Sequence, residues 1–379
     1  MHRYGNPRTR HFRLLLLMVA ASSLVVTACS SSKSKGTDPS KPGSSAGGDA
    51  SKAVALLAQY TTRPTTFSLT VPVGKPIPTG KTIAYINCGN TICASQGPIL
   101  ETAAKVLGWT VNTINTDGTP AQIQNAWAQV LRQKPDGVIY TSTPRAQINA
   151  QIKAVAAAGI PIAACCEADE AGDGIIYYSE NKSAIAKEGP AIATWIAATS
   201  GGSGDAVFAN TPEFPILSGI ASTLKSSLAE QCSGCSLSEL DLPLSSIGKN
   251  ATDLIVSYLR THPKTKYVAL STDLVGLGLP GMLKSAGLTD IKTIGNAPGT
   301  PTLQYIATGQ QAASIIYPEY ENMYAMLDAL ARKITGVPVQ PAIDPPVFIG
   351  TQKNLPSSTT LFPVVPDLEA IFAKLWGKG

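Results

Sequence analysis

Short apolar runs alternate with amphipathic runs along residues 80–178. The apolar runs, at 82–88, 110–114, 137–141, 161–166 and 174–178, are rich in aliphatic and β-branched residues and lack a strict period of two. This is the pattern of strands that are covered on both faces of a sheet. The runs therefore predict five strands of a parallel sheet, joined by helices that cover it.

The amphipathic runs carry recognisable helix start and stop signals. Thr119, Pro120 and Gln122 supply an N-cap, a first-turn proline and a capping-box amide ahead of apolar positions at helical spacing. Pro144 begins the next such run and Gly159 ends it. These signals predict a helix after each of the second and third strands.

A second series of the same kind follows. Strands are expected at 205–209, 236–242, 266–271, 291–296 and 312–317, with helices that include 214–229, 250–260 and 273–286. Two consecutive sets of five units predict two similar α/β lobes instead of one large sheet. In open α/β sheets ligands bind beyond the carboxyl ends of the strands. Two lobes that face each other would therefore form a cleft.

The N-terminus has the features of an export signal. Four arginines within residues 3–13 precede an apolar stretch at 14–28, which is shorter than the roughly 20 residues of a membrane-spanning helix. The stretch ends Val-Thr-Ala before Cys29, which resembles a bacterial lipobox. We expect a signal peptide over 1–28 and acylation of Cys29; two acyl chains suffice for stable membrane attachment.

Residues 29–52 are rich in Ser, Gly, Pro and Lys and predict a flexible tether, followed by an N-terminal extension at 53–79. The formal net charge of +5 falls to about +1 (5 − 4) once the four signal arginines are removed. No basic block remains to indicate nucleic-acid binding. We expect the membrane to be contacted through the lipid anchor alone.

Short motifs from residue 81 to residue 340 resemble the ribose-binding-protein-like family of periplasmic sugar-binding proteins. They occur in a fixed order: KTIA at 81–84, KPDGVI at 134–139, AAGIPI at 157–162, HP at 262–263 and TIG at 293–295. The resemblance implies a type I periplasmic-binding-protein fold, with two doubly wound parallel-sheet lobes joined by a multi-strand hinge. Lobe one would comprise 80–178 plus 318–345, and lobe two 179–317 plus 346–379, the C-terminal tail.

The same resemblance implies a function and a site. The chain would act as a monomer that captures a small molecule outside the cytoplasm and delivers it to an ABC-type permease by hinge closure. Positions that match the family's ligand contacts lie at strand ends: Asn90, Thr91, Ile92, Cys166, Glu167, Phe214, Thr272, Asp273, Asn296 and Tyr317. The family's arginine and several of its acids are absent here, so we expect either a sugar-like ligand or a less hydroxyl-rich, aromatic or amphipathic one.

The cysteines other than Cys29 are even in number, which outside the cytoplasm favours disulfides. Cys232 and Cys235 are expected to form a local structural bridge. Four further cysteines belong to the first lobe, and their pairing is open: Cys88, Cys93, Cys165 and Cys166. With no histidine in either loop, we expect no metal site.

The sequence gives little support for an enzymatic function. Two of the three histidines leave with the signal peptide, and His262 lies at a helix end where it cannot serve a catalytic triad. No dinucleotide-binding fingerprint is present, and we expect no cofactor. Two alternatives to import stay open: a ligand-sensing subunit for a membrane receptor, and an extracytoplasmic enzyme or redox protein.

Overall fold

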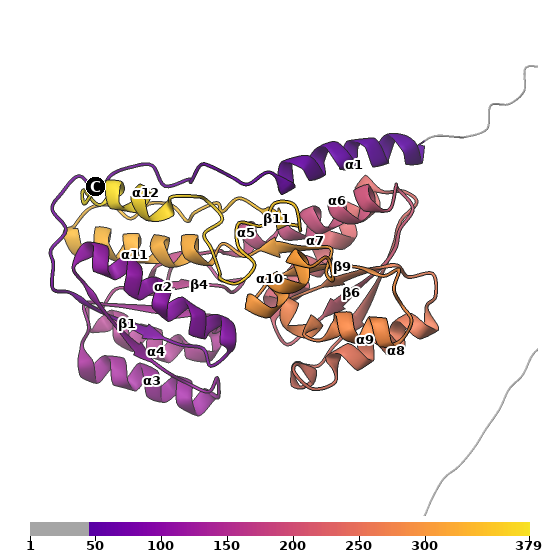
Figure 1. Cartoon of the computed structure of the whole chain (residues 1–379). Coiled ribbons are helices and arrows are strands. Elements are labelled where there is room, and N and C mark those ends of the chain that lie inside the picture. Colours follow the sequence, from indigo (N-terminus) through magenta and orange to yellow (C-terminus); the bar gives the residue numbers. More distant parts are fainter. Residues whose placement is uncertain (1–44) are drawn as a thin grey trace, which may run out of the picture. The chain divides into compact units, whose positions relative to one another are not determined.

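The computed structural model describes residues 45–379, apart from the side chains of residues 45–48, Thr91 and Ala184. The predicted signal peptide, Cys29 and most of the predicted tether lie outside these residues. The described chain forms two lobes, each built on a sheet of parallel strands with helices on both faces (Figure 1). This confirms the predicted fold class. None of the helices within residues 45–379 is long and apolar enough to cross a membrane.

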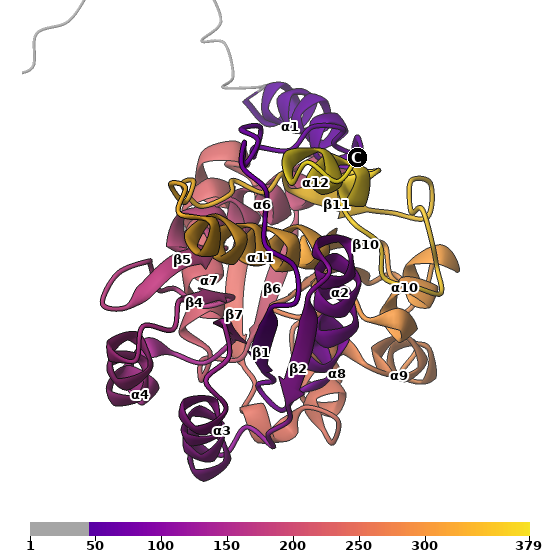
Figure 2. The ribbon, with the colours of Figure 1, turned by 90° about the vertical axis from the view of Figure 1, so that its left-hand side faces the viewer.

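Lobe one contains a five-stranded parallel sheet in the order β2-β1-β3-β4-β5. Its strands are β1 (Thr82–Ile86), β2 (Thr110–Ile114), β3 (Gly137–Thr141), β4 (Ile162–Cys165) and β5 (Ile175–Ser179). Helices α2 (Thr91–Leu107) and α11 (Glu319–Thr335) cover one face, and α3 (Pro120–Gln133) and α4 (Arg145–Ala157) the other (Figure 2). Neighbouring strand residues therefore bury their side chains in different cores, which explains the absence of polar alternation.

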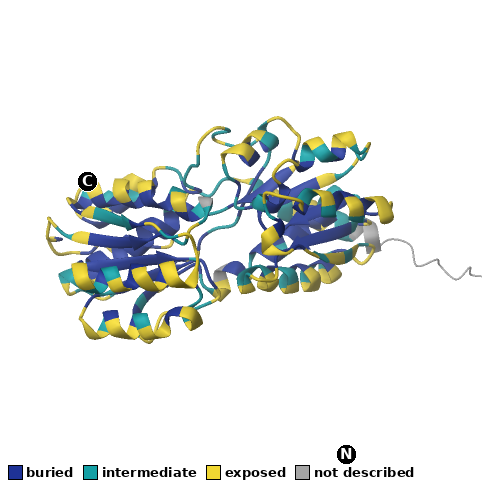
Figure 3. Ribbon diagram, turned by 90° about the horizontal axis from the view of Figure 1, so that it is seen from below, coloured by how far each residue is buried: buried dark blue, intermediate teal, exposed yellow. Residues whose placement is uncertain are grey.

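Lobe two contains a six-stranded sheet in the order β11-β10-β9-β8-β6-β7. Its parallel strands are β6 (Asp205–Asn210), β7 (Ser236–Asp241), β8 (Tyr267–Leu270), β9 (Lys292–Asn296) and β10 (Ala313–Ile316). The short β11 (Phe348–Gly350) pairs antiparallel with β10 and was not predicted, because three residues carry too little pattern. Figure 3 shows that the inner strands of both lobes are buried while the outer helix faces are exposed. The edge strands β2 and β7 are only partly buried.

The helices of lobe two include the two expected at 214–229 and 250–260. The helices of this lobe are α5 (Lys182–Ile185), α6 (Glu188–Thr199), α7 (Pro215–Gln231), α8 (Ala251–Thr261), α9 (Leu279–Ser285), α10 (Thr300–Ala307) and the 3-10 helices η1 (Leu244–Ser246) and η2 (Asp273–Gly276). The predicted helix at 273–286 was wrong, since η2 and α9 replace it. Gly278 lies between them with φ of 86°, and Pro280 is in the first turn of α9. A left-handed glycine followed by a proline ends one helix and begins another.

The chain passes between the lobes more than once. After β5 it enters lobe two, after β10 it returns to α11 in lobe one, and after β11 it returns again as α12 (Leu368–Leu375). Helix α12, in the C-terminal tail, packs in lobe one. Phe372 and Trp376 pack against Tyr324 of α11, with ring centroids 5.2 and 6.0 Å apart, and the indole of Trp376 donates a 2.9 Å hydrogen bond to Asp328.

The N-terminal extension contacts both lobes. Helix α1 (Ser45–Thr61) begins inside the region predicted as tether. The buried Ala53 and the partly buried Leu57 and Tyr60 pack against lobe two. The following extended run buries Phe67 and neighbouring residues in lobe one, and Arg63 donates a 3.0 Å hydrogen bond to the carbonyl of Val364.

Candidate functional site

The carboxyl ends of the strands of both sheets border a cavity of about 220 Å³. Lobe one contributes the start of α2 and the turns after β3 and β4; lobe two contributes α5, α7, η1 and the turns after β8 and β9. Glu180 and Tyr317 belong to the connections between the lobes. This is the place where α/β sheets bind ligands, and both lobes supply its walls.

Four non-glycine residues with left-handed backbone conformations line this cavity. Ser142, Cys166, Glu180 and Ala297 have φ of 51°, 76°, 46° and 56°, and each directly follows a strand. A left-handed conformation costs a residue with a Cβ about 1–2 kcal/mol. Such strain persists where the surrounding structure enforces it and gathers at binding and catalytic sites. Its repetition at the ends of β3, β4, β5 and β9 marks the cavity as the candidate functional site.

Most positions predicted to contact a ligand border this cavity. They are Asn90, Ile92, Cys166, Glu167, Phe214, Thr272, Asn296 and Tyr317. Thr91 begins α2, but its side chain lies outside the described residues. Asp273 lines the adjoining pocket and not this cavity, and its carboxylate accepts hydrogen bonds from Gln311 (2.7 Å) and Ser314 (2.6 Å) within lobe two.

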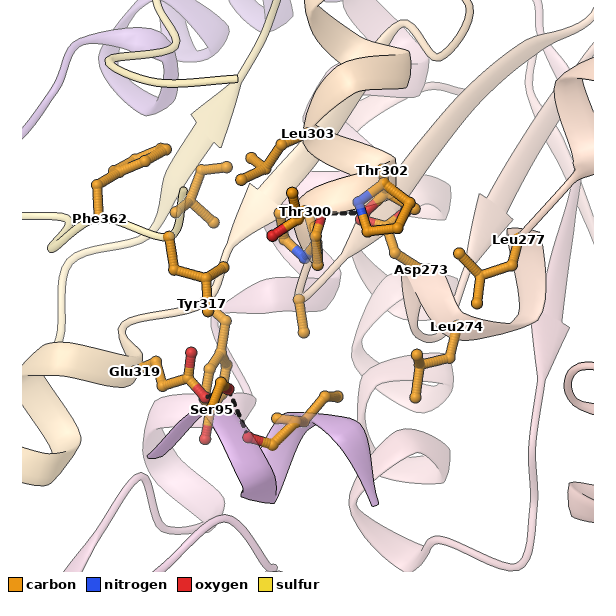
Figure 4. A pocket seen from close by; sticks show the side chains of 17 residues that line it. Ser95, Asp273, Leu274, Leu277, Thr300, Thr302, Leu303, Tyr317, Glu319 and Phe362 are labelled. Carbon is orange, nitrogen blue, oxygen red and sulfur yellow. Dashed lines mark hydrogen bonds between the residues drawn. The ribbon is translucent and has the colours of Figure 1, made fainter. Parts of the chain in front are cut away.

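A second pocket of about 330 Å³ adjoins the first and shares Tyr317 with it. Figure 4 shows Ser95 and Glu319 on one side of this pocket and Leu274 and Leu277 on the other. The hydroxyl of Ser95 donates a 2.7 Å hydrogen bond to the carboxylate of Glu319. Ile92, Leu274 and Ala297 also line both spaces, so an elongated ligand in the main cavity has room to extend.

Three carboxylates line the main cavity, and sequence reasoning found only Glu167. Burial first, and then the nearby charge of Asp169, raise the pKa of Glu167 to about 7. Burial also raises the pKa of Glu188 to about 7, against the hydrogen bond that Asn296 donates to it. These two acids are partly protonated at neutral pH when no ligand is bound.

The third carboxylate, Glu180, lies on the connection after β5. Burial first, and then the neighbouring charge of Glu188, hold its pKa well above the usual range of a carboxyl. The hydroxyl of Tyr317 and the amide of Asn322 both donate hydrogen bonds to Glu180. Glu180 directly follows a predicted strand, so its position was a usable signal; Glu188 sits in the first turn of a helix, where an acid is ordinary.

The apolar part of the cavity wall comes largely from lobe two, and polar side chains line the rest: Asn90, Gln96, Ser142, Ser271, Thr272 and Asn296. The contributing apolar side chains are Ile185, Phe214, Ile216, Leu217, Ile220, Leu244, Ile247 and Leu274. Leu244 at this rim is 43% exposed, and Leu277 of the adjoining pocket is 38% exposed. Among the described residues, no lysine, arginine or histidine lines either space. The site is therefore acidic at the hinge and apolar on lobe two.

The cysteines of the described chain are paired in the structure. Cys88 is bonded to Cys93, Cys165 to the adjacent Cys166, and Cys232 to Cys235. The Cys165–Cys166 bridge is in the cavity wall, since Cys166 lines it. A bridge between neighbouring residues restricts the turn after β4 and so holds Glu167 in place.

Comparisons with known proteins agree with this architecture. Several solved structures share the fold at low sequence identity. An ABC sugar transporter subunit from Rhodobacter sphaeroides is 21% identical over 73% of this chain and 99% of that chain, with a TM-score of 0.62. An ABC transporter solute-binding protein from Agrobacterium vitis, bound to α-D-tagatopyranose, is 20% identical over 73% of this chain and 96% of its own, with a TM-score of 0.64.

A periplasmic ribose ABC transporter protein from Conexibacter woesei is 18% identical over 74% of this chain and 94% of that chain, with a TM-score of 0.62. A comparison with curated protein sequences finds no match. The family model described as "periplasmic binding protein domain" matches residues 83–337, which is more than half of the chain. This chain therefore belongs to the periplasmic-binding-protein family, a family of binding proteins and not of enzymes.

Proposed function

We propose that this protein is an extracytoplasmic lipoprotein that captures a small molecule in the interlobe cavity and delivers it to an ABC-type permease. The observation that carries the proposal is the cavity itself: both lobes wall it, and four strained strand-end turns border it. The solved structures that share this fold include proteins of sugar ABC transporters, one of them holding a sugar.

Closure of the lobes is the mechanism that this arrangement supports. A ligand that contacts one lobe leaves the open state favoured, whereas contacts from both lobes supply the differential affinity that favours the closed state. The exposed Leu244 and Leu277 stand at the rims of the two spaces. Their burial on closure adds to the free energy of the closed state at roughly 25 cal/mol per Å² of apolar surface.

Ligand capture is tested by a thermal-shift screen of sugars, polyols, aromatic acids and organic amines with the mature chain. A ligand at 100 times its dissociation constant adds about 2.7 kcal/mol of stability. X-ray scattering of the same samples should show a smaller radius of gyration with each ligand that stabilises the protein. A ligand that stabilises the protein without compaction would rule out hinge closure.

Membrane attachment and delivery need cellular assays. The full chain should fractionate with membranes and take up radiolabelled palmitate, and Cys29→Ala should abolish both. Uptake of the identified ligand by cells should fall when the gene is deleted and return with the intact chain. Normal uptake in the deletion strain, together with loss of a transcriptional response to the ligand, would favour the receptor role over import.

A further inference from the structure

The acids of the cavity have no cationic partner within residues 45–379. Glu167 is 2% exposed, Glu180 is 3% exposed and Glu188 is 6% exposed. The ion pairs of the described chain involve other residues, and none includes these three carboxylates. Glu319 of the adjoining pocket is likewise buried without a cation. Buried carboxylates are ordinarily paired with a cation or neutralised by a proton. This binding site therefore lacks the positive charge that would balance its carboxylates.

Unpartnered hydrogen-bond acceptors line the same cavity. Asn296 is 5% exposed; its amide nitrogen donates a 2.6 Å hydrogen bond to Glu188, while its carbonyl oxygen has no partner in the described chain. Ser271 is 1% exposed and its hydroxyl is also without a partner there. A buried polar atom that lacks a hydrogen bond costs about 1–3 kcal/mol. The orientation of Asn296 adds an acceptor beside Glu188, where a ligand with N–H groups would satisfy both.

The opposite wall fits an apolar group. Ile216, Leu217 and Ile220 present one face of α7, and Leu244 and Ile247 of the η1 region continue it. Phe214, at the N-terminus of α7, adds an aromatic ring to the same wall. These residues offer few hydrogen bonds to hydroxyl groups, so a polyhydroxylated ligand would leave many of its own groups unsatisfied on this side.

We propose that the ligand is an amphipathic organic cation, whose protonated amine or quaternary ammonium head lies against Glu180, Glu188 and Asn296 and whose apolar body lies against α7. This inference rests on the proposed function, because it names the class of molecule that the same cavity captures. It departs from the sugars expected from the fold, since here an acidic hinge faces an aliphatic wall.

Binding of such a cation releases protons. Glu167 and Glu188 have pKa values raised to about 7 by burial, and burial also holds the pKa of Glu180 well above the usual range of a carboxyl. The groups that face Glu180 are Glu167, Glu188, Glu319 and Tyr317, and none of them is cationic. A cation favours the ionised carboxylates, so its affinity rises with pH from about 6 to 8. A neutral sugar has no such dependence on the charge of these groups.

The test is calorimetric titration of the mature chain with matched probes: phenethylammonium and benzyltrimethylammonium as cations, 2-phenylethanol as the neutral analogue, and D-tagatose as a sugar. We expect the cations to bind at least about tenfold more tightly than 2-phenylethanol, because the free energy of a charge-assisted contact corresponds to about a tenfold change in affinity. Titrations in two buffers of different ionisation enthalpy should reveal proton release with the cations alone.

Two isosteric variants test which carboxylates bind the cation. Glu180→Gln and Glu188→Gln should each weaken cation binding about ten- to hundredfold without lowering the melting temperature of the ligand-free protein, because each removes a buried charge. Glu101→Gln, on the exposed face of α2, is the matched control and should change neither quantity. A purely structural role for Glu180 or Glu188 predicts the opposite result, a lower melting temperature.

The outcomes separate this inference from the proposed function. Equal affinity for the cations and 2-phenylethanol, no cation binding at millimolar concentration, or binding unchanged in both glutamine variants overturns the cationic ligand. If D-tagatose then binds with lobe closure in scattering, the proposed function stands with a sugar as its ligand. If no member of the wider screen binds or compacts the protein, the proposed function fails as well.

Discussion

Glu319 offers a quantitative test of the acidic hinge, because its environment is simple. The carboxylate is 6% exposed at the start of α11, and its one hydrogen bond is accepted from Ser95. Burial raises its pKa from 4.5 to about 7, against the effect of that hydrogen bond. Glu319→Gln keeps the size and the acceptor oxygen but removes the charge, so the variant isolates the cost of ionisation.

The sign and size of the effect follow from proton linkage. A carboxyl whose pKa is raised by folding holds its proton more tightly in the native state than in the unfolded state. Its contribution to the free energy of unfolding is therefore complete below about pH 4.5 and is lost as the pH rises through 7. With these two pKa values the native state is penalised by about 3 kcal/mol at pH 8 and by less than about 1 kcal/mol at pH 5. We expect Glu319→Gln to be more stable than the parent by about 2–3 kcal/mol at pH 8 and nearly equal to it at pH 5.

The assay is urea unfolding of both proteins from pH 5 to pH 8, followed by tryptophan fluorescence and by circular dichroism. Coincidence of the two signals is needed before a two-state free energy is taken from the curves. Glu101→Gln should follow the parent at every pH. A stability difference for Glu319→Gln that does not change with pH, or a loss of stability at pH 8, would refute the assignment of Glu319 as a buried, unpaired acid.

Three further predictions concern other parts of the fold. Phe372→Ala should lower stability by about 3–5 kcal/mol in urea unfolding, since its ring packs within 5.3 Å of Phe67 and anchors α12, whereas the exposed Val54→Ala should change it by less than about 0.5 kcal/mol. Ala297→Gly should raise the melting temperature by relieving a left-handed turn, and Gly89→Ala should lower it, because the added Cβ would clash with the backbone of Gly118. Mass spectrometry after alkylation should find no free thiol in the exported protein until a reductant is added, and three bridges in its digest: Cys88–Cys93, Cys165–Cys166 and Cys232–Cys235.

The strands were predictable because their pattern has a direct physical cause. The inner parallel strands are covered on both faces, so their residues are mostly apolar, and the observed bounds fall within a residue or two of the predicted ones. The edge strands β2 and β7 are partly exposed and contain polar residues. Elements that depend on partners far along the chain were harder. Helix α1 is stabilised where Ala53 and Leu57 meet lobe two, and α12 where Phe372 meets lobe one. The amino-acid composition of these two helices predicts neither contact.

The candidate site divides in the same way into positions that the sequence predicts and contacts that it does not. Positions at strand ends could be placed by topology, because the carboxyl ends of parallel strands share one edge of the sheet. What these side chains do there depends on partners that the order of residues hides. Asp273 follows a strand as expected, yet Gln311 and Ser314, some forty positions later, engage its carboxylate. Glu188 is close to the cavity only because α6 begins beneath β9, where Asn296 reaches it.

One of the cavity acids, Glu180, lies on the hinge itself, and this gives ligand charge a direct route to lobe closure. Glu180 lies on the connection that leaves β5, and Tyr317 lies on the connection that leaves β10; the tyrosine hydroxyl donates its hydrogen bond to the glutamate. A cation that ionises Glu180 changes the charge on one connection and strengthens its bond to the other. A neutral ligand can shift the lobes only through its contacts with the walls. Glu180→Gln should therefore weaken cation binding and also reduce the compaction that a saturating cation produces.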